Sequence, residues 1–287
     1  MYKFTPIRKT LVWGTEDWVI SGVPGSESVV AEGPEAGKKI TELFPGTFPL
    51  LIKFIDAKRD LSIQVHPDNE LAAKRHGCSG KTEMWYVIGA EPGAKLISGL
   101  KRQITPDEYV RLVEEHRITE VLAEQTVAPG DVFYMPSGRI HSIGGGCFLA
   151  EIQQTSDITY RIYDYNRPGL DGKPRQLHTQ VAKDAIDYHV YPEYRTPYAA
   201  KQNEPVELIR CPYFTTTLYD LTSPSFAGLT GESPFLIAIG LSGAGTIKTA
   251  QDEKKLSPGE AVLIPAAEGE NSFIPAASGW KFLTTHP

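Results

Sequence analysis

The chain contains one turn–strand–turn pattern twice, and this internal repeat restricts the folds open to it. The segment PGDVFYMPSGRIHSI (129–143) resembles PGEAVLIPAAEGENSF (258–273), with a Pro-Gly turn before each predicted strand and a proline after it. The aligned pairs are Pro129 with Pro258, Gly130 with Gly259, and Pro136 with Pro265. A supersecondary unit that recurs in order along a chain is typical of a duplicated domain.

A second match precedes each of these segments. WYVIGAEPGAKLISGL (85–100) resembles LIAIGLSGAGTIKTA (236–250), and Gly89 falls opposite Gly240. The spacing between the two matches is longer in the first half, by about the length of a helical stretch near 101–125. We therefore predict a duplicated β-barrel with a helical insert in the first copy, although chance similarity between Gly/Pro turn signals is the alternative.

The rest of the chain also reads as short strands joined by turns, with few helices. Apolar or alternating runs predict strands at 48–57, 61–67, 131–136, 141–143, 147–154 and 158–166, and a hairpin of 83–89 with 94–100. Helices are predicted at 37–44, at 68–77 with Asp68 as cap and Gly77 as stop, at 105–124, and near 179–187. We expect a first domain over 1–200 and a second over 201–287.

Composition excludes several classes of protein. The net charge of −6 gives no broadly basic surface for nucleic acid. Three cysteines without a CxxC pair predict free thiols in a reducing compartment. No apolar run approaches the roughly 20 residues of a membrane-spanning helix, and the first residues lack a signal-peptide core. A cytoplasmic protein is expected.

Four side chains form a candidate metal site. Gln64 and His66 are two residues apart on a predicted strand, so they point to one face. Glu83 begins a later strand, and His141 ends the string GDVFYMPSGRIH, which has the form G-x5-P-x-G-x2-H. Taken singly, a surface histidine or a solvated glutamate is the commoner explanation. The string around His141 is far more specific than any single residue.

These motifs resemble the cupin superfamily and, within it, the type I phosphomannose isomerases. GDVFYMPSGRIH resembles the second cupin motif, and Gln64, His66 and Glu83 fit the first, with a longer loop between them. LSIQVHPD (61–68), GKTEMWYVI (80–88) and EIQQTSDITYRIYDYNR (151–167) follow the order of that family. The resemblance implies two cupin (jelly-roll) barrels, mainly β, of the short bacterial form.

The resemblance also implies a chemistry. Gln64, His66, Glu83 and His141 would hold one Zn²⁺ per chain, a mixed N/O set that also suits Fe(II) or Mn(II). A closed, purely structural zinc site is the alternative. Lys81, Glu151 and Arg161 would be the catalytic groups, interconverting mannose 6-phosphate and fructose 6-phosphate through an enediol or enediolate. The non-catalytic alternatives are an outward-facing Arg161 on the surface and a salt bridge from Glu151 to Arg161.

The substrate phosphate is assigned, by the same resemblance, to Ser62 and Lys53, although a lysine in this apolar run could also reach the surface. The second barrel is predicted to have no metal, because the counterparts of Glu83 and His141 are Pro234 and Glu270. Trp13-Gly14-Thr15 departs from the family's usual WGG, so the resemblance does not predict the loops at the rim of the substrate site.

A cupin oxygenase and a non-catalytic sugar-binding cupin are the rival functions. The expected partner is a small sugar phosphate, not nucleic acid or membrane, and the protein is expected to be a monomer or homodimer.

Overall fold

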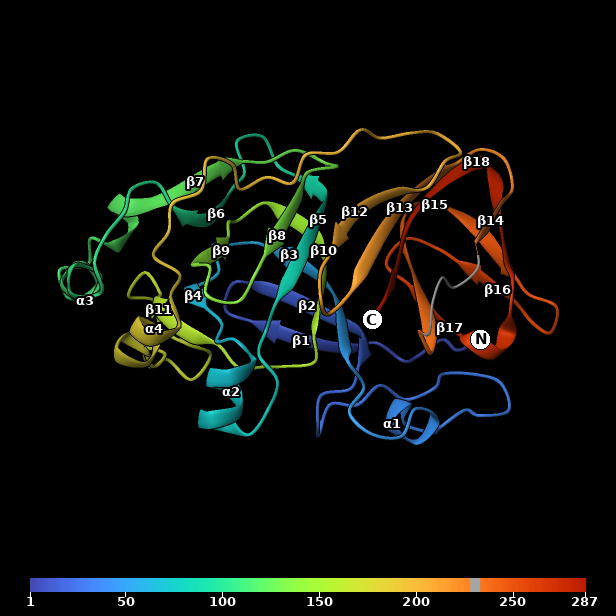
Figure 1. The fold of residues 1–287 in the computed structure, drawn as a ribbon, viewed down its shortest axis with the longest axis horizontal. Coiled ribbons are helices and arrows are strands. Elements are labelled where there is room, and N and C mark those ends of the chain that lie inside the picture. Colours follow the sequence, from blue (N-terminus) through green and yellow to red (C-terminus); the bar gives the residue numbers. More distant parts are fainter. Residues whose placement is uncertain (228–232) are drawn as a thin grey trace. The chain divides into compact units, whose positions relative to one another are not determined.

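The computed structural model describes residues 1–227 and 233–287, and its secondary structure is mainly β (Figure 1). Its contacts divide the chain into two compact units. The central unit comprises Arg8–Trp18 and Leu51–Thr196, and the C-terminal unit comprises Met1–Ile7, Val19–Leu50 and Pro197–Pro287. The segment 19–50 thus belongs with the C-terminal unit, so the division does not follow a single cut near residue 200.

Two antiparallel sheets carry the central fold. The six-stranded sheet has the order β1 (Ile7–Leu11), β2 (Gly14–Ser21), β3 (Leu50–Ala57), β10 (Cys147–Gln154), β5 (Glu83–Ala90), β8 (Val132–Met135). The five-stranded sheet has the order β11 (Tyr160–Tyr163), β4 (Ile63–Val65), β9 (His141–Ile143), β6 (Lys95–Leu100), β7 (Leu122–Thr126). Trp85 and Leu149 of the first sheet share a buried cluster with Leu96 and Ile143 of the second. The core therefore lies between the two sheets, as in a β-sandwich.

The predicted hairpin of 83–89 with 94–100 is wrong. Both strands exist, as β5 and β6, but β5 pairs with β10 and β8 whereas β6 pairs with β9 and β7. The short turn between them carries the chain from one sheet to the other. Alternating burial is the same for a hairpin and for such a crossover, so the sequence pattern could not distinguish them.

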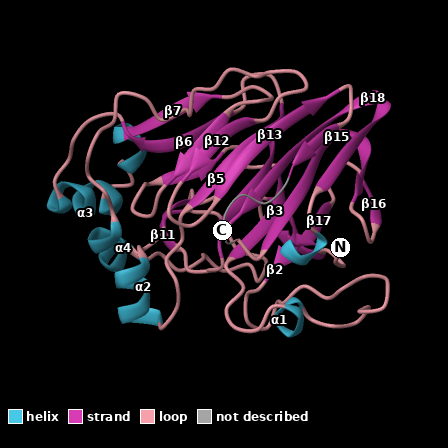
Figure 2. Cartoon of the chain, turned by 45° about the vertical axis from the view of Figure 1, so that its right-hand side comes forward, coloured by secondary structure: helices cyan, strands magenta, loops and turns pink. Residues whose placement is uncertain are grey.

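Helices α2, α3 and α4 lie on one side of the central sheets (Figure 2). Helix α2 (Asn69–His76) begins and ends as predicted: the Asp68 carboxylate accepts from Leu71 N, and Gly77 is left-handed. The predicted helix at 105–124 is shorter, because α3 (Pro106–Glu114) and a 3₁₀ turn, η1 (Ile118–Val121), are followed directly by β7. Helix α4 (Thr179–Ala185) packs with α3 over the outer face of β4, where Ile63 and Val65 are fully buried.

The C-terminal unit has its own sheet and core. Its strands are β12 (Val206–Arg210), β13 (Thr215–Leu221), β14 (Ser225–Ala227), β15 (Phe235–Lys248), β16 (Glu253–Leu256), β17 (Ala261–Pro265) and β18 (Asn271–His286). β15 and β18 are long, and their pairing is shifted near Gly240 and Gly243, where bulges let a sheet bend. The predicted helix at 37–44 is a single turn, α1 (Ile40–Leu43), and η2 (Ala266–Glu268) follows β17.

The internal repeat is present in the six-stranded sheet and in the sheet of the C-terminal unit, with one correction to the predicted alignment. Pairing of β5 with β8 around the Gly130 turn corresponds to pairing of β15 with β17 around the Gly259 turn. Gly130 N donates to Val87 O, and Gly259 N donates to Gly240 O. The counterpart of Gly240 is therefore Val87, two residues before Gly89.

This shift changes the assigned counterpart of Glu83. Glu83 lies opposite Met135, and the equivalent position opposite Ile264 is Leu236, not Pro234. Leu236 is buried in the apolar cluster of its own sheet. A two-residue shift keeps the same face, so an apolar side chain stands where the central unit has a carboxylate.

Within the described ranges, every helix is too short or too polar to cross a membrane.

Candidate metal centre and active site

Three of the predicted site residues form a row across the five-stranded sheet. Gln64 of β4 lies opposite His141 of β9 on one side and opposite Arg161 of β11 on the other. Directly opposed residues on neighbouring strands project to the same face. Ile63 and Val65 occupy the other face, under the helices, so the alternation of β4 directs Gln64 inward.

The six-stranded sheet supplies charged groups from the facing side. Glu83 begins β5, Glu151 lies in β10, and Lys53 lies in β3, while Lys81 precedes β5 by two residues. All four side chains are buried, with Glu83 completely inaccessible. Four buried charges in one place require close partners, because desolvation of an isolated charge is costly.

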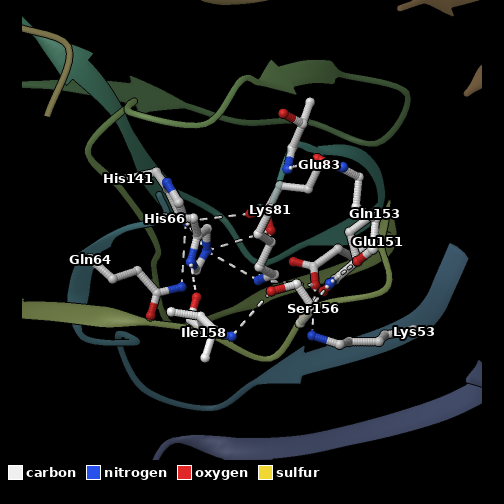
Figure 3. A network of polar contacts seen from close by, with 12 residues as sticks. Lys53, Gln64, His66, Lys81, Glu83, His141, Glu151, Gln153, Ser156 and Ile158 are labelled. Carbon is white, nitrogen blue, oxygen red and sulfur yellow. Dashed lines mark hydrogen bonds and ion pairs between the residues drawn. The ribbon is translucent and has the colours of Figure 1, made fainter. Parts of the chain in front are cut away.

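His66, Glu83 and His141 converge closely enough to share one cation (Figure 3). His141 Nε2 lies 3.2 Å from His66 Nε2 and 3.3 Å from Glu83 Oε1. His66 Nε2 lies 3.6 Å from Glu83 Oε2. The ligand atoms of all three lie within 4.8 Å of one another.

Both imidazoles are oriented by backbone carbonyls. His66 Nδ1 donates to Ile158 O and His141 Nδ1 donates to Arg139 O, each at 2.8 Å. A carbonyl can only accept, so this pairing places the proton on Nδ1 and leaves the Nε2 lone pair directed at the cluster. Burial holds the pKa of His66 well below its usual value, helped by Lys81, and burial lowers the pKa of His141 to about 4. Both rings are therefore neutral at pH 7, the form that binds metals.

Glu83 gives the test of whether a metal fits. Neither of its oxygens accepts a hydrogen bond of good geometry, although Lys81 Nζ lies 2.8 Å from Oε2. Burial and the charge of Glu151 raise the pKa of Glu83 to about 7, against the opposing effect of Lys81. A buried carboxylate short of partners, facing two imidazole lone pairs, is a donor set that suits a divalent cation.

Gln64 lies at the edge of this cluster. Its Nε2 is 3.4 Å from His141 Nε2, and its Oε1 is 3.4 Å from Ser62 Oγ. The two ends of a carboxamide are nearly identical in shape, so a half-turn of this group would direct the oxygen at the cluster. The Ser62 hydroxyl, as donor or acceptor, is compatible with either orientation.

A cavity of about 150 Å³ opens beside the cluster. Four of the predicted site residues line this cavity: Gln64, Lys81, Glu151 and Arg161. Its further lining includes Ser62, Lys53, Glu16, Asp157, Thr159 and Arg175.

Arg161 lies in a positively charged part of this wall. Its Nη1 donates to Gln176 O at 2.9 Å, and its buried Nε has no partner. Arg175 and Arg167 both pair with the buried carboxylate of Asp164. Burial, followed by repulsion from Arg175, lowers the pKa of Arg161 below its ordinary value. Three guanidinium groups against the carboxylates of Asp164 and Asp157 leave one positive charge in excess, which favours an anionic ligand.

Glu151 and Lys81 stand between the cluster and the cavity. Lys81 Nζ lies 3.1 Å from His66 Nε2 and 3.9 Å from Glu151 Oε1. Although burial acts to raise it, the ammonium groups of Lys53 and Lys81 lower the pKa of Glu151 to about 2. Glu151 is therefore ionised at neutral pH, and its partner is a lysine, not Arg161.

Lys53 has partners that the sequence did not indicate. Its buried Nζ donates to Glu151 Oε1 at 2.8 Å and lies 3.8 Å from Glu16 Oε2. Against the effect of burial, Glu151 and Glu16 raise the pKa of Lys53 above its ordinary value. Ser62, the other residue assigned to the phosphate, is buried and lines the cavity.

Sequence reasoning missed Trp85 and the loop after β10. Trp85 lies opposite Glu151 and donates Nε1 to its Oε2 at 2.9 Å. Its position two residues after Glu83 could have signalled an inward side chain. Gln153 donates to Gln154 O and Ser156 O, which shapes the loop that presents Ile158 O to His66. No sequence signal identifies a backbone carbonyl as an orienting group.

Comparison with known proteins gives the family. The model for the type I phosphomannose isomerase catalytic domain matches residues 16–91, and that for the mannose-6-phosphate isomerase cupin domain matches 206–274. Mannose-6-phosphate isomerase ManA of Bacillus subtilis is 33% identical, with 93% of each chain covered.

Solved structures agree. The crystal structure of mannose 6-phosphate isomerase from Bacillus subtilis has a TM-score of 0.89 at 29% identity, covering 100% of this chain and 99% of that one. A zinc-bound mannose 6-phosphate isomerase shares the fold, with a TM-score of 0.76 at 14% identity over 99% of this chain and 98% of its own. The chain therefore belongs to the type I phosphomannose isomerase family, a family of cupin-fold mannose-6-phosphate isomerases.

Proposed function

We propose that this protein interconverts mannose 6-phosphate and fructose 6-phosphate by proton transfer through an enediol or enediolate, with one zinc ion per chain. The observation that carries the proposal is the convergence of two imidazole Nε2 atoms on the buried, poorly partnered carboxylate of Glu83. That cluster lies beside a cavity that Lys81, Glu151 and Arg161 line.

The proposed zinc ligands are Gln64, His66, Glu83 and His141. When bound, zinc would polarise the substrate oxygens near carbons 1 and 2. The name of the zinc-bound relative and the nitrogen and oxygen donors support this choice of metal.

Lys81 and Glu151 are the proposed acid–base groups. Isomerisation removes the proton on carbon 2 and returns one to carbon 1, so a proton acceptor and a proton donor must both reach the carbon chain. Glu151 is held as a carboxylate, and Lys81 carries protons 3.9 Å away.

Arg161 is proposed to stabilise negative charge on the substrate. Its partner-free Nε and the neighbouring Arg175 make this wall of the cavity attractive to anions. Ser62, buried in the same cavity, is proposed to donate its hydroxyl to the phosphate.

The test is a coupled assay of fructose 6-phosphate formation from mannose 6-phosphate. His141→Ala removes a proposed ligand, and His189→Ala, on an exposed side chain, is the matched control. We expect turnover in the wild type and the control, and none detectable in His141→Ala. A wild-type protein that binds zinc but converts no hexose phosphate would leave the sugar-binding alternative standing.

A further inference from the structure

The ion pair between Lys53 and Glu151 sets the position of a proposed acid–base group. Lys53 lies on β3, which neighbours β10 in the six-stranded sheet. The distance from Lys53 Nζ to Glu151 Oε1 is 2.8 Å, and both side chains are nearly inaccessible. A buried pair at this distance is fixed, because separating it would leave two desolvated charges.

Glu151 is restrained at both oxygens. Lys53 donates to Oε1, and the Trp85 indole donates to Oε2 at 2.9 Å. Two donors on different strands leave the carboxylate little rotational freedom. It is thereby held 3.9 Å from Lys81 without joining it in a close ion pair.

The charge around Lys53 is already matched. Glu151 and Glu16 both face its Nζ, and Glu16 is itself fixed by accepting from Trp18 Nε1 at 2.6 Å. A phosphate brought to Lys53 would meet two carboxylates and be repelled. A less fully paired cation of the same cavity is Arg161, on the five-stranded sheet, whose buried Nε has no partner.

We propose that Lys53 is a positioning residue, which holds the Glu151 carboxylate in place beside Lys81 and does not contact the substrate phosphate. The proposal rests on the isomerase function proposed above. Without Lys53, Glu151 would turn to its remaining cation, Lys81, and draw it from Glu83. Both acid–base groups would then be displaced while the anion-binding wall stayed intact.

The test separates turnover from binding in the zinc-loaded protein. For Lys53→Met we expect kcat to fall by about 100-fold or more. We expect KM for mannose 6-phosphate to stay within about threefold and zinc content to be unchanged. Lys53→Arg, which keeps the charge, should recover part of kcat. Lys58→Met, at an exposed lysine, is the control and should match the wild type.

A double variant, Lys53→Met with Glu151→Gln, tests whether Lys53 affects kcat through Glu151. If Lys53 acts through Glu151, adding Lys53→Met to Glu151→Gln should not lower kcat further. The affinities of Glu151→Gln and of the double variant for mannose 6-phosphate, measured by calorimetry, should agree within about threefold. The double variant also removes both buried charges, so it remains informative if Lys53→Met alone does not fold.

An affinity at least about tenfold weaker in the double variant than in Glu151→Gln would overturn the proposal, because Lys53 would then contribute to substrate binding. An independent effect of Lys53→Met on kcat in the Glu151→Gln background would overturn it as well. If the wild type turns over no mannose 6-phosphate, the proposed function fails. The coupling between Lys53 and Glu151 is then measured from the unfolding midpoints of the wild type, the two single variants and the double variant. If the midpoint shifts of the single variants add up to that of the double variant, the two residues are not coupled and the positioning role is overturned.

Discussion

The Nε2 atoms of His66 and His141 lie 3.2 Å apart, although each ring donates its proton from Nδ1 to a backbone carbonyl. Two lone pairs at this separation repel each other unless a cation lies near both. The Lys81 ammonium lies 3.1 Å from His66 Nε2. This relationship makes the pair of histidines a direct sign of a metal site.

Zinc should therefore stabilise the folded protein. Excess zinc at about 100 times its dissociation constant raises the free energy of unfolding by about 2.7 kcal/mol for a ligand that binds only the folded state. Thermal or urea unfolding with and without zinc measures this. His141→Ala should lose the zinc-dependent shift and His189→Ala should keep it. An equal shift in both variants would place the zinc elsewhere.

Lys81→Met should reduce turnover while leaving zinc bound. Lys81 Nζ lies 2.8 Å from Glu83 Oε2 and 3.9 Å from Glu151 Oε1, and its loss removes one half of the proposed acid–base pair. We expect kcat to fall by about 10²–10⁴-fold, the usual contribution of such a group. Steady-state kinetics and metal analysis check this, with Lys74→Met on α2 as control. A kcat within about threefold of wild type would exclude Lys81 from the chemistry.

Arg161→Lys should be nearly as harmful as a neutral substitution. Lysine keeps the charge but loses the planar guanidinium, which binds Gln176 O and belongs to a residue that lines the cavity. We expect kcat/KM to fall about 100-fold, equivalent to about 3 kcal/mol of transition-state stabilisation. Arg210→Lys, on an exposed side chain of β12, is the matched control. Unaltered kinetics in Arg161→Lys would show that the guanidinium does not reach the substrate.

Glu151 should make the stability of the chelator-treated protein depend on pH in the acid range. Its folded pKa of about 2 lies below the ordinary value of 4.5, so the ionised form is favoured by folding. Its contribution to stability is present above pH 4.5 and is lost as the pH falls toward 2. Unfolding of wild type and Glu151→Gln between pH 6 and about 2.5 should therefore converge at the acid end. Parallel curves over that range would contradict the assigned pKa.

Local patterns in the sequence predicted much of the fold. Asp68 and Gly77 bound α2 because capping depends on neighbours a few residues away. Alternation along β4 placed Gln64 on the inner face because the strand's other face is buried under helices. The pairing of β5 and β6 was mispredicted because a turn of the same length can close a hairpin or cross between sheets.

The site was harder to predict wherever the answer depends on register between distant strands. The counterpart of Glu83 in the second sheet is Leu236, since hydrogen bonds at Gly130 and Gly259, and not glycine spacing, define the equivalence. Lys53 could be seen as an unusual charge in an apolar run, but its partners lie on β10 and in β2. Those contacts are set by strand order, which single-strand patterns do not contain.

Stepwise zinc titration of the chelator-treated protein tests the central claim most directly. We predict no conversion of mannose 6-phosphate without metal, and activity that rises in proportion to added zinc until one equivalent per chain is bound. Activity that persists after complete metal removal, or that zinc does not restore in a folded protein, would contradict a zinc-dependent isomerase built on Gln64, His66, Glu83 and His141.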